Sequence, residues 1–272
     1  MEKIFFTIMA FIFGLLTGSF LNVCIYRIPA GKSIVYPRSH CYSCGTYLKV
    51  RDLFPVLSHF FSGGICRTCG SVISFRYSFI ELLTATLTAV FFYKFYFSLT
   101  TLFFIIILHF MIIITFIDLD YLIIPDGISV GGTIAGFFIN FLIIIFAPYE
   151  ILEIAGYNLT FESVVLGILL GGGSLFLISV LSGGGMGGGD IKLMAAIGAW
   201  FGVEFTASVL FLSFILGAVI GVFLIITKIK SRKDYVPFGP YIAVAVLITM
   251  YFGSDVMYKI GSNIIWNLRL GI

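Results

Sequence analysis

Seven long apolar runs dominate the sequence and limit what the chain can fold into. A helix rises about 1.5 Å per residue and the hydrocarbon core of a bilayer is about 30 Å thick, so about 20 apolar residues cross it. The runs lack the alternation of barrel strands, and only helices satisfy the backbone in lipid over such lengths. We therefore expect an all-α polytopic membrane protein. The runs lie near residues 4–25, 78–97, 101–117, 128–147, 161–181, 204–227 and 236–252.

The composition points the same way. Hydrophobic residues make up 60% of the 272 residues and charged residues only 11%, whereas an ordinary soluble domain is about 45–50% apolar and about 25% charged. That composition excludes a soluble enzyme, a nucleic-acid-binding domain and a disordered protein, and it makes the lipid bilayer a partner. The first run is longer than the core of a signal peptide, so we expect residues 1–25 to be a retained first span.

A shorter apolar run at 191–201 decides the number of spans. It is either a short helix paired with the next one, which gives eight spans, or a re-entrant piece, which gives seven. Only eight spans put the basic cluster at 228–233 on the same side as the basic loop 26–77, and basic loops face the cytoplasm. We therefore favour about eight transmembrane helices. The cytoplasmic loops would then be 26–77, 118–127, 182–192 and 228–235.

Four of the five cysteines form two CxxC pairs in the polar loop 26–77. Each pair offers two thiolates to one face of a tetrahedral metal, and the 21 residues between the pairs are close to zinc-ribbon spacing. Two disulfides or four free thiols are the alternatives, but disulfides are rare in the cytoplasm. We expect a structural zinc, because four cysteines leave no open coordination position. The expected ligands are Cys41, Cys44, Cys66 and Cys69, whereas Cys24 lies in the first span as a packed thiol.

Three carboxylates follow the apolar run 101–117 within nine residues: Asp118, Asp120 and Asp126. A carboxylate at a membrane boundary is costly unless it is hydrated or used. A solvated acidic loop is a reasonable interpretation of Asp120 and Asp126 but a weaker one of Asp118, which directly continues the helix. Pro125 breaks the chain and would let Asp126 cap the next helix.

A glycine-rich stretch, residues 182–192, contains six glycines and ends in Asp190-Ile-Lys192. It is not a phosphate loop, because no Gly-Lys-Ser/Thr ending is present. A flexible linker with Asp190 as the helix N-cap is one interpretation. The other is that Asp190 meets Asp118, which emerges on the same side of the membrane. Two carboxylates that close share a proton, so one can activate water while the other polarises a carbonyl, as in aspartyl proteases.

Several motifs in order make the sequence similar to type IV prepilin peptidases, a family of GxGD membrane aspartic proteases. The resemblance implies that Asp118 and Asp190 are the catalytic pair, with Asp120 and Asp126 as neighbours. It also implies a cytoplasmic zinc-binding domain at 26–77 and a membrane-embedded peptidase domain at 78–272. Departures are small and touch neither the carboxylates nor the thiols, for example Ser78 where proline is usual. The motifs lie at 18–29, 41–69, 76–85, 118–126, 187–192 and 237–240.

The resemblance implies an endopeptidase of the bacterial inner membrane that removes the positively charged leader from prepilins or pseudopilins at the cytoplasmic face. Many such enzymes also methylate the new N-terminus with S-adenosylmethionine, an activity that the resemblance links to the zinc loop. No dinucleotide-type glycine fingerprint marks a site for that cofactor. The alternatives are a transporter or scaffold with intramembrane acids, or another GxGD protease of the presenilin or archaeal preflagellin type. The four-cysteine loop favours the prepilin type.

Overall fold

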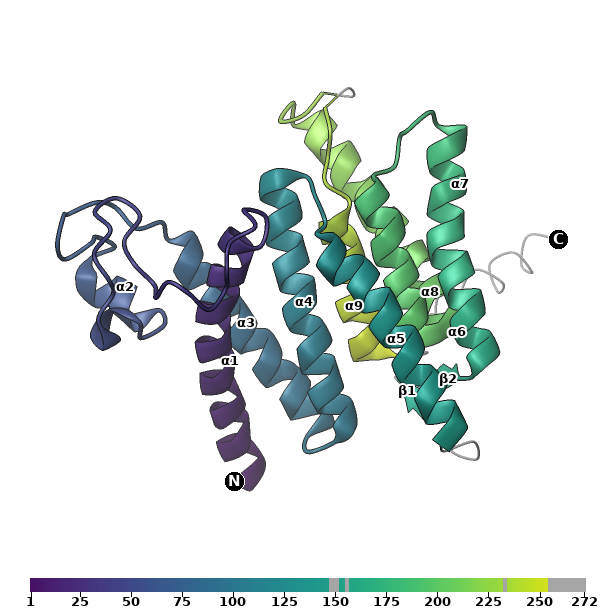
Figure 1. The fold of residues 1–272 in the computed structure, drawn as a ribbon, viewed down its shortest axis with the longest axis horizontal. Helices are drawn as coiled ribbons and strands as arrows, with labels where there is room; N and C mark the ends of the chain where they lie inside the picture. The colour runs from purple at the N-terminus through teal and green to yellow at the C-terminus, as the bar shows by residue number, and fades with distance from the viewer. Residues whose placement is uncertain (147–151, 155–156, 232–233, 254–272) are drawn as a thin grey trace. The chain divides into compact units, whose positions relative to one another are not determined.

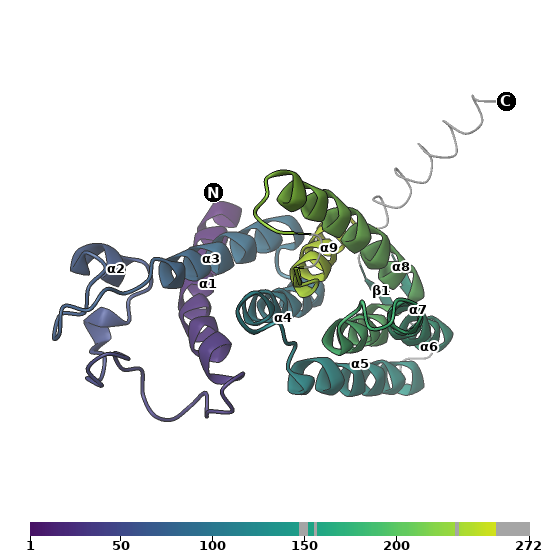
Figure 2. The same cartoon turned by 90° about the horizontal axis from the view of Figure 1, so that it is seen from above.

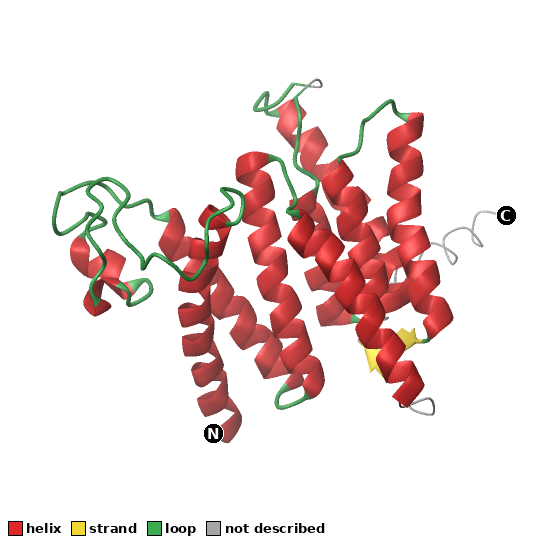
Figure 3. Ribbon diagram, in the orientation of Figure 1, coloured by secondary structure: helices red, strands yellow, loops and turns green. Residues whose placement is uncertain are grey.

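The structure is a computed structural model that describes residues 1–146, 152–154, 157–231 and 234–253. The chain forms two compact units, Met1–Ile117 and Asp118–Ile272, and the boundary falls inside helix α4, Leu99–Tyr121. Helices dominate the described residues of both units (Figure 3). The all-α polytopic fold expected from the sequence is confirmed.

In the first unit, α1 and α3 pack closely through small residues. A Cβ added at Gly14 would lie 2.6 Å from Cα of Ala85, and one added at Gly18 would lie 2.8 Å from Cα of Glu81. Small residues let helix backbones approach closely, which is how helices associate in lipid. The elements of this unit besides α4 are α1 (Glu2–Arg27), the 3₁₀ turn η1 (Val50–Asp52), α2 (Leu57–Ser62) and α3 (Arg76–Phe95).

In the second unit, α8 is the central element and packs against α5, α6, η2 and α9. The elements are α5 (Asp126–Phe146), β1 (Leu152–Ile154), β2 (Tyr157–Leu159), α6 (Phe161–Ile168), the π-helical turn η2 (Leu169–Gly173), α7 (Ser174–Leu181), α8 (Gly188–Ile226) and α9 (Gly239–Phe252). Together α6, η2 and α7 cover 161–181, the span expected from the sequence.

Helix α8 folds back on itself at Gly202. This residue has φ 75° and ψ −176°, a conformation that only glycine adopts readily. Gly171 of η2 lies against both Met194 and Thr206. The parts of α8 before and after Gly202 therefore both run past Gly171, in opposite directions. Both ends of α8 accordingly lie at the same end of this unit (Figure 1). The run 191–201 is therefore a helix paired with the next one, as the eight-span arrangement requires.

The surface of the described helices is apolar. Large hydrophobic side chains are exposed along α1, α5, α7 and α8, among them Phe13, Ile134, Leu181 and Phe223. Six described helices are long and apolar enough to cross a membrane, with α8 counted once and the shorter α9 left out. Soluble monomers rarely expose such continuous apolar surface, so these faces contact lipid and the chain is a multi-pass membrane protein.

One element differs from the sequence-based expectation. The segment between the apolar runs 128–147 and 161–181 shows no strand pattern in the sequence, but β1 and β2 pair there as a short antiparallel ladder, with Leu152 opposite Leu159 and Ile154 opposite Tyr157. In a strand of three residues the alternation of apolar and polar residues is too short to be recognised in a sequence with long apolar runs on both sides.

We expect Gly198→Val to unfold the second unit at a lower temperature than the unaltered chain. A Cβ at Gly198 would collide with the backbone of Gly167 in α6, and overpacking of this kind costs about 1–3 kcal/mol or more. Thermal unfolding in detergent measures the effect. The matched control is Gly221→Val, also in α8, where a Cβ would meet nothing within 4 Å. Equal unfolding temperatures for the two variants would contradict the packing described here.

Candidate active site and metal site

Asp118 lies in the last turn of α4 and is only 5% exposed. Its Oδ2 accepts a hydrogen bond of 2.9 Å from the backbone N–H of Gly239, the first residue of α9. A Cβ at Gly239 would lie 2.7 Å from the same oxygen, so this approach needs glycine. Because the N-terminus of a helix carries unpaired N–H groups and a partial positive charge, α9 provides a polar partner for the carboxyl group. Asp118 is therefore not a solvated loop residue.

Asp190 lies in the first turn of α8, where Gly187 is the N-cap. Its carboxyl group accepts a hydrogen bond from the backbone N–H of Gly187, which is the reach-back half of a capping box. Asp190 is therefore the third helical residue, and the alternative that it is the N-cap itself is wrong.

The carboxyl groups of Asp118 and Asp190 interact electrostatically. The glycines next to them share Ile124 as a neighbour: a Cβ added at Gly189, which precedes Asp190, would lie 3.0 Å from Cβ of Ile124, and one added at Gly239, whose N–H binds Asp118, would lie 3.3 Å from its Cδ1. Two acids far apart in the sequence are thus brought together where α4 ends and where α8 and α9 begin. Such a pair can hold a single proton between its members.

A surface ion pair lies beside this carboxyl pair. Lys192 Nζ is 2.7 Å from Oδ1 of Asp126, and both side chains are partly exposed. Asp126 is the first residue of α5 and Lys192 is the fifth of α8, so the pair connects the start of α5 to the N-terminal part of α8. The sequence correctly places Asp126 at a helix start, but its carboxylate is engaged by Lys192. Asp120 is exposed, as expected for a residue that faces water.

Sequence reasoning missed two partners at the site, the N–H group of Gly239 and the ammonium group of Lys192. Both residues lie inside motifs that the sequence analysis used only as family matches. A signal for Gly239 exists: Pro237 and Pro240 bracket it at the start of an apolar run, and proline in the first turn marks a helix N-terminus. No local signal would have paired Lys192 with Asp126.

The four cysteine sulfurs of the loop form one cluster. All four Sγ atoms lie within 4.8 Å of one another, and those of Cys41 and Cys69 are 3.9 Å apart. A tetrahedron with zinc–sulfur bonds of about 2.3 Å has edges of about 3.8 Å, so the cluster fits a zinc ion. All five cysteines of the chain are free of disulfides, so the disulfide alternative does not hold in this structure.

The two CxxC pairs have the same local structure. The N–H of Gly45 donates to the carbonyl of Cys41, and the N–H of Gly70 donates to that of Cys66, each at 2.8 Å. Both glycines have positive φ, 70° and 72°, which glycine adopts without strain. Each CxxC pair therefore ends in a tight glycine turn.

The turn at the first pair favours a thiolate. Hydrogen bonds from the N–H of Cys44, then from the Ser71 hydroxyl and the N–H of Ser43, lower the pKa of Cys41 to about 6. The thiolate is the form of cysteine that binds a metal.

Comparison with known proteins places the chain among bacterial peptidases. A family model described as the bacterial peptidase A24 N-terminal domain matches residues 12–95, and one described as the type IV leader peptidase family matches residues 105–222. No solved structure matches the chain.

The curated relatives span nearly the full chain. A prepilin leader peptidase/N-methyltransferase of Bacillus subtilis is 34% identical over 91% of this chain and 94% of the relative. Proteins of the same name from Pseudomonas putida and Legionella pneumophila are each 30% identical, over 94% of both chains for the first and over 90% and 91% for the second. Similarity of this extent, together with the paired carboxyl groups and the cysteine cluster, establishes that the chain belongs to the type IV leader peptidase family.

Proposed function

We propose that this chain is a membrane aspartic endopeptidase that removes the leader from type IV prepilins or pseudopilins. The observation that carries the proposal is the pairing of Asp118 with Asp190, where α4 ends and α8 and α9 begin. The names of the relatives supply the substrate class, prepilins. The same names favour this function over a transporter or scaffold with intramembrane acids.

The proposed chemistry uses one shared proton. The ionised carboxyl group takes a proton from water, and the hydroxyl oxygen so formed attacks the scissile carbonyl carbon. The protonated carboxyl group hydrogen-bonds the carbonyl oxygen and lowers the barrier to attack. The proton taken from water then passes to the leaving amine. The N–H groups of Gly187 and Gly239 orient the two acids, and the glycines of 182–189 leave room for an extended peptide.

The proposed location is the cytoplasmic face of the bacterial inner membrane. The loop 26–77 carries seven lysines and arginines against one aspartate, a bias that favours the cytoplasm. Asp118 follows the apolar part of α4 directly, so the site lies at the membrane boundary. A prepilin whose basic leader is in the cytoplasm and whose apolar helix is in the bilayer presents its scissile bond there.

We propose further that residues 26–77 fold around a structural zinc held by the four cysteines, and that 78–272 carries the peptidase. The names of the relatives also support N-methylation of the new N-terminus. S-adenosylmethionine, when bound, would supply the methyl group to the free amine.

Asp118→Asn and Asp190→Asn should each reduce prepilin cleavage by more than about 10³-fold, because each removes a carboxyl group from the proton-sharing pair. Mass spectrometry of a prepilin incubated with the protein in proteoliposomes measures the released leader. Asp120→Asn is the matched control, since Asp120 is an exposed acid two residues away, and it should retain cleavage. Normal cleavage by either Asp118→Asn or Asp190→Asn would exclude the proposed pair.

Elemental analysis should find one zinc per chain, and the double variant Cys41→Ser/Cys44→Ser should lose it because two thiolate ligands are absent. Cys24→Ala serves as the control, since Cys24 is packed in α1 and is not part of the cluster, and it should keep the metal. A metal-free unaltered protein with reduced thiols would show that the cluster does not bind zinc.

Lys192→Met should lower kcat/KM by up to about fivefold, because an exposed ion pair of this kind contributes up to about 1 kcal/mol and this one connects the starts of α5 and α8 close to Asp190. Lys192→Arg preserves the charge and should retain most of the activity. The exchange Asp126→Lys/Lys192→Asp should recover part of the loss. If Lys192→Met cleaves at the rate of the unaltered chain, the ion pair has no positioning role.

A further inference from the structure

Five large apolar side chains near α2 are exposed on one stretch of the loop. We name them the phenylalanine face. An apolar patch that no other part of the first unit covers marks a site of interaction with a partner or a membrane. The face consists of Leu53, Phe54, Leu57, Phe60 and Phe61, which are 43%, 54%, 54%, 78% and 73% exposed.

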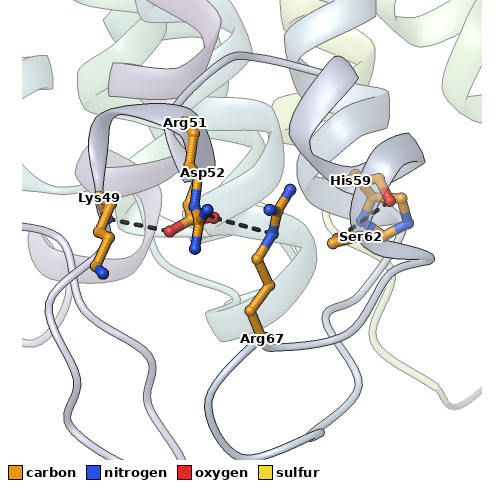
Figure 4. Close-up of polar contacts among 6 residues, drawn as sticks. All are labelled: Lys49, Arg51, Asp52, His59, Ser62 and Arg67. Atoms are coloured by element: carbon orange, nitrogen blue, oxygen red, sulfur yellow. Dashed lines mark hydrogen bonds and ion pairs between the residues drawn. The ribbon is translucent and has the colours of Figure 1, made fainter.

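The other side of α2 faces the rest of the first unit. The His59 ring packs edge-on to Phe75, with ring centroids 6.0 Å apart, and its Nδ1 is buried. Ser62 Oγ donates a hydrogen bond to the carbonyl of His59 (Figure 4). The short helix therefore presents its polar residues inward and its apolar residues outward, the reverse of a helix on a water-soluble surface.

A hydrogen bond fixes α2 beside a membrane-spanning helix. The N–H of Val56, the residue before α2, donates to Oε2 of Glu81 at 2.8 Å. Glu81 is five residues after Arg76, where α3 begins, and five residues correspond to roughly 7 Å along a helix. Val56 has φ 59°, which is unusual for a β-branched residue and shows that its surroundings hold the turn in place.

The figures agree with this placement within the first unit. Figure 1 shows α2 beside the loop ends of α1 and α3, and the view from above in Figure 2 also shows it displaced sideways from those helices. Because α1 and α3 are both candidate spans, a segment level with the first turns of α3 lies at the depth of the lipid headgroups.

Basic side chains border the phenylalanine face. Asp52 lies between Arg67, at 3.3 Å, and Arg51, at 4.0 Å (Figure 4). Lys49 adds a further exposed positive charge, so this segment carries three basic side chains and one acid. A positive border around exposed aromatic side chains complements an anionic lipid surface, with the rings at the acyl boundary and the cations at the phosphates.

We propose that the phenylalanine face is inserted into the headgroup region of the leaflet on the loop side, with Lys49, Arg51 and Arg67 close to the phosphates of anionic lipids. The lipid surface is the occupant favoured because the hydrogen bond from Val56 to Glu81 holds the face at bilayer depth. This anchors the four-cysteine loop to the membrane independently of the peptidase chemistry.

Tryptophan fluorescence of the full-length protein in nanodiscs tests the proposal. Phe60→Trp and, separately, Phe61→Trp are measured in phosphatidylcholine with acyl chains brominated near the headgroup, as differences from the unaltered protein so that native tryptophans cancel. The control is Val72→Trp, in the same loop, 84% exposed and outside the face. Zinc content checks the folding of each variant.

The face variants should be quenched roughly twofold more by brominated lipid than the control. Added phosphatidylglycerol should deepen the quenching, and Arg51→Gln should weaken that response. Quenching equal to that of Val72→Trp in both face variants would overturn the proposal. A change that appears only when a prepilin is added would also overturn it, because the face would then bind a peptide segment.

Discussion

The structure depends on supplying polar partners to two carboxyl groups at an apolar boundary. Water is scarce there, so an acid needs hydrogen-bond donors from the protein. Backbone N–H groups at the beginnings of helices provide them: Gly239 for Asp118 and Gly187 for Asp190. Glycine stands at both positions because a Cβ at either would lie within 2.8 Å of the carboxylate that it contacts. The glycine-rich motif therefore serves the acids directly.

The position of Asp190 depends on packing far from the site. Helix α8 reverses at Gly202, and its first stretch is pressed against α6 and η2 through the backbones of Gly167, Gly171 and Gly198. Close contact of backbones fixes the depth of this stretch, because no flexible side chain lies between them to absorb a shift. A change at Gly198 would thus be transmitted to the carboxyl pair at the start of the same helix.

The cysteine loop is organised by two separate interactions within the first unit. Repeated glycine turns gather the four sulfurs, and the hydrogen bond from Val56 to Glu81 attaches α2 to a membrane-spanning helix. The first interaction is local to each CxxC pair. The second joins segments that belong to the loop and to α3, and it determines which side of α2 is left exposed.

The sequence by itself determined the helical membrane fold and the approximate bounds of the spans, and it singled out four cysteines and two acids as candidate site residues. These properties follow from run length, residue spacing and order, which are local. Only the tertiary structure decided that Asp118 and Asp190 lie together, that Gly239 and Lys192 take part, that α8 reverses at Gly202 and that α2 turns its phenylalanines outward. Each of these joins or orients residues through packing of distant segments, and no periodicity in the chain encodes which helix end meets which.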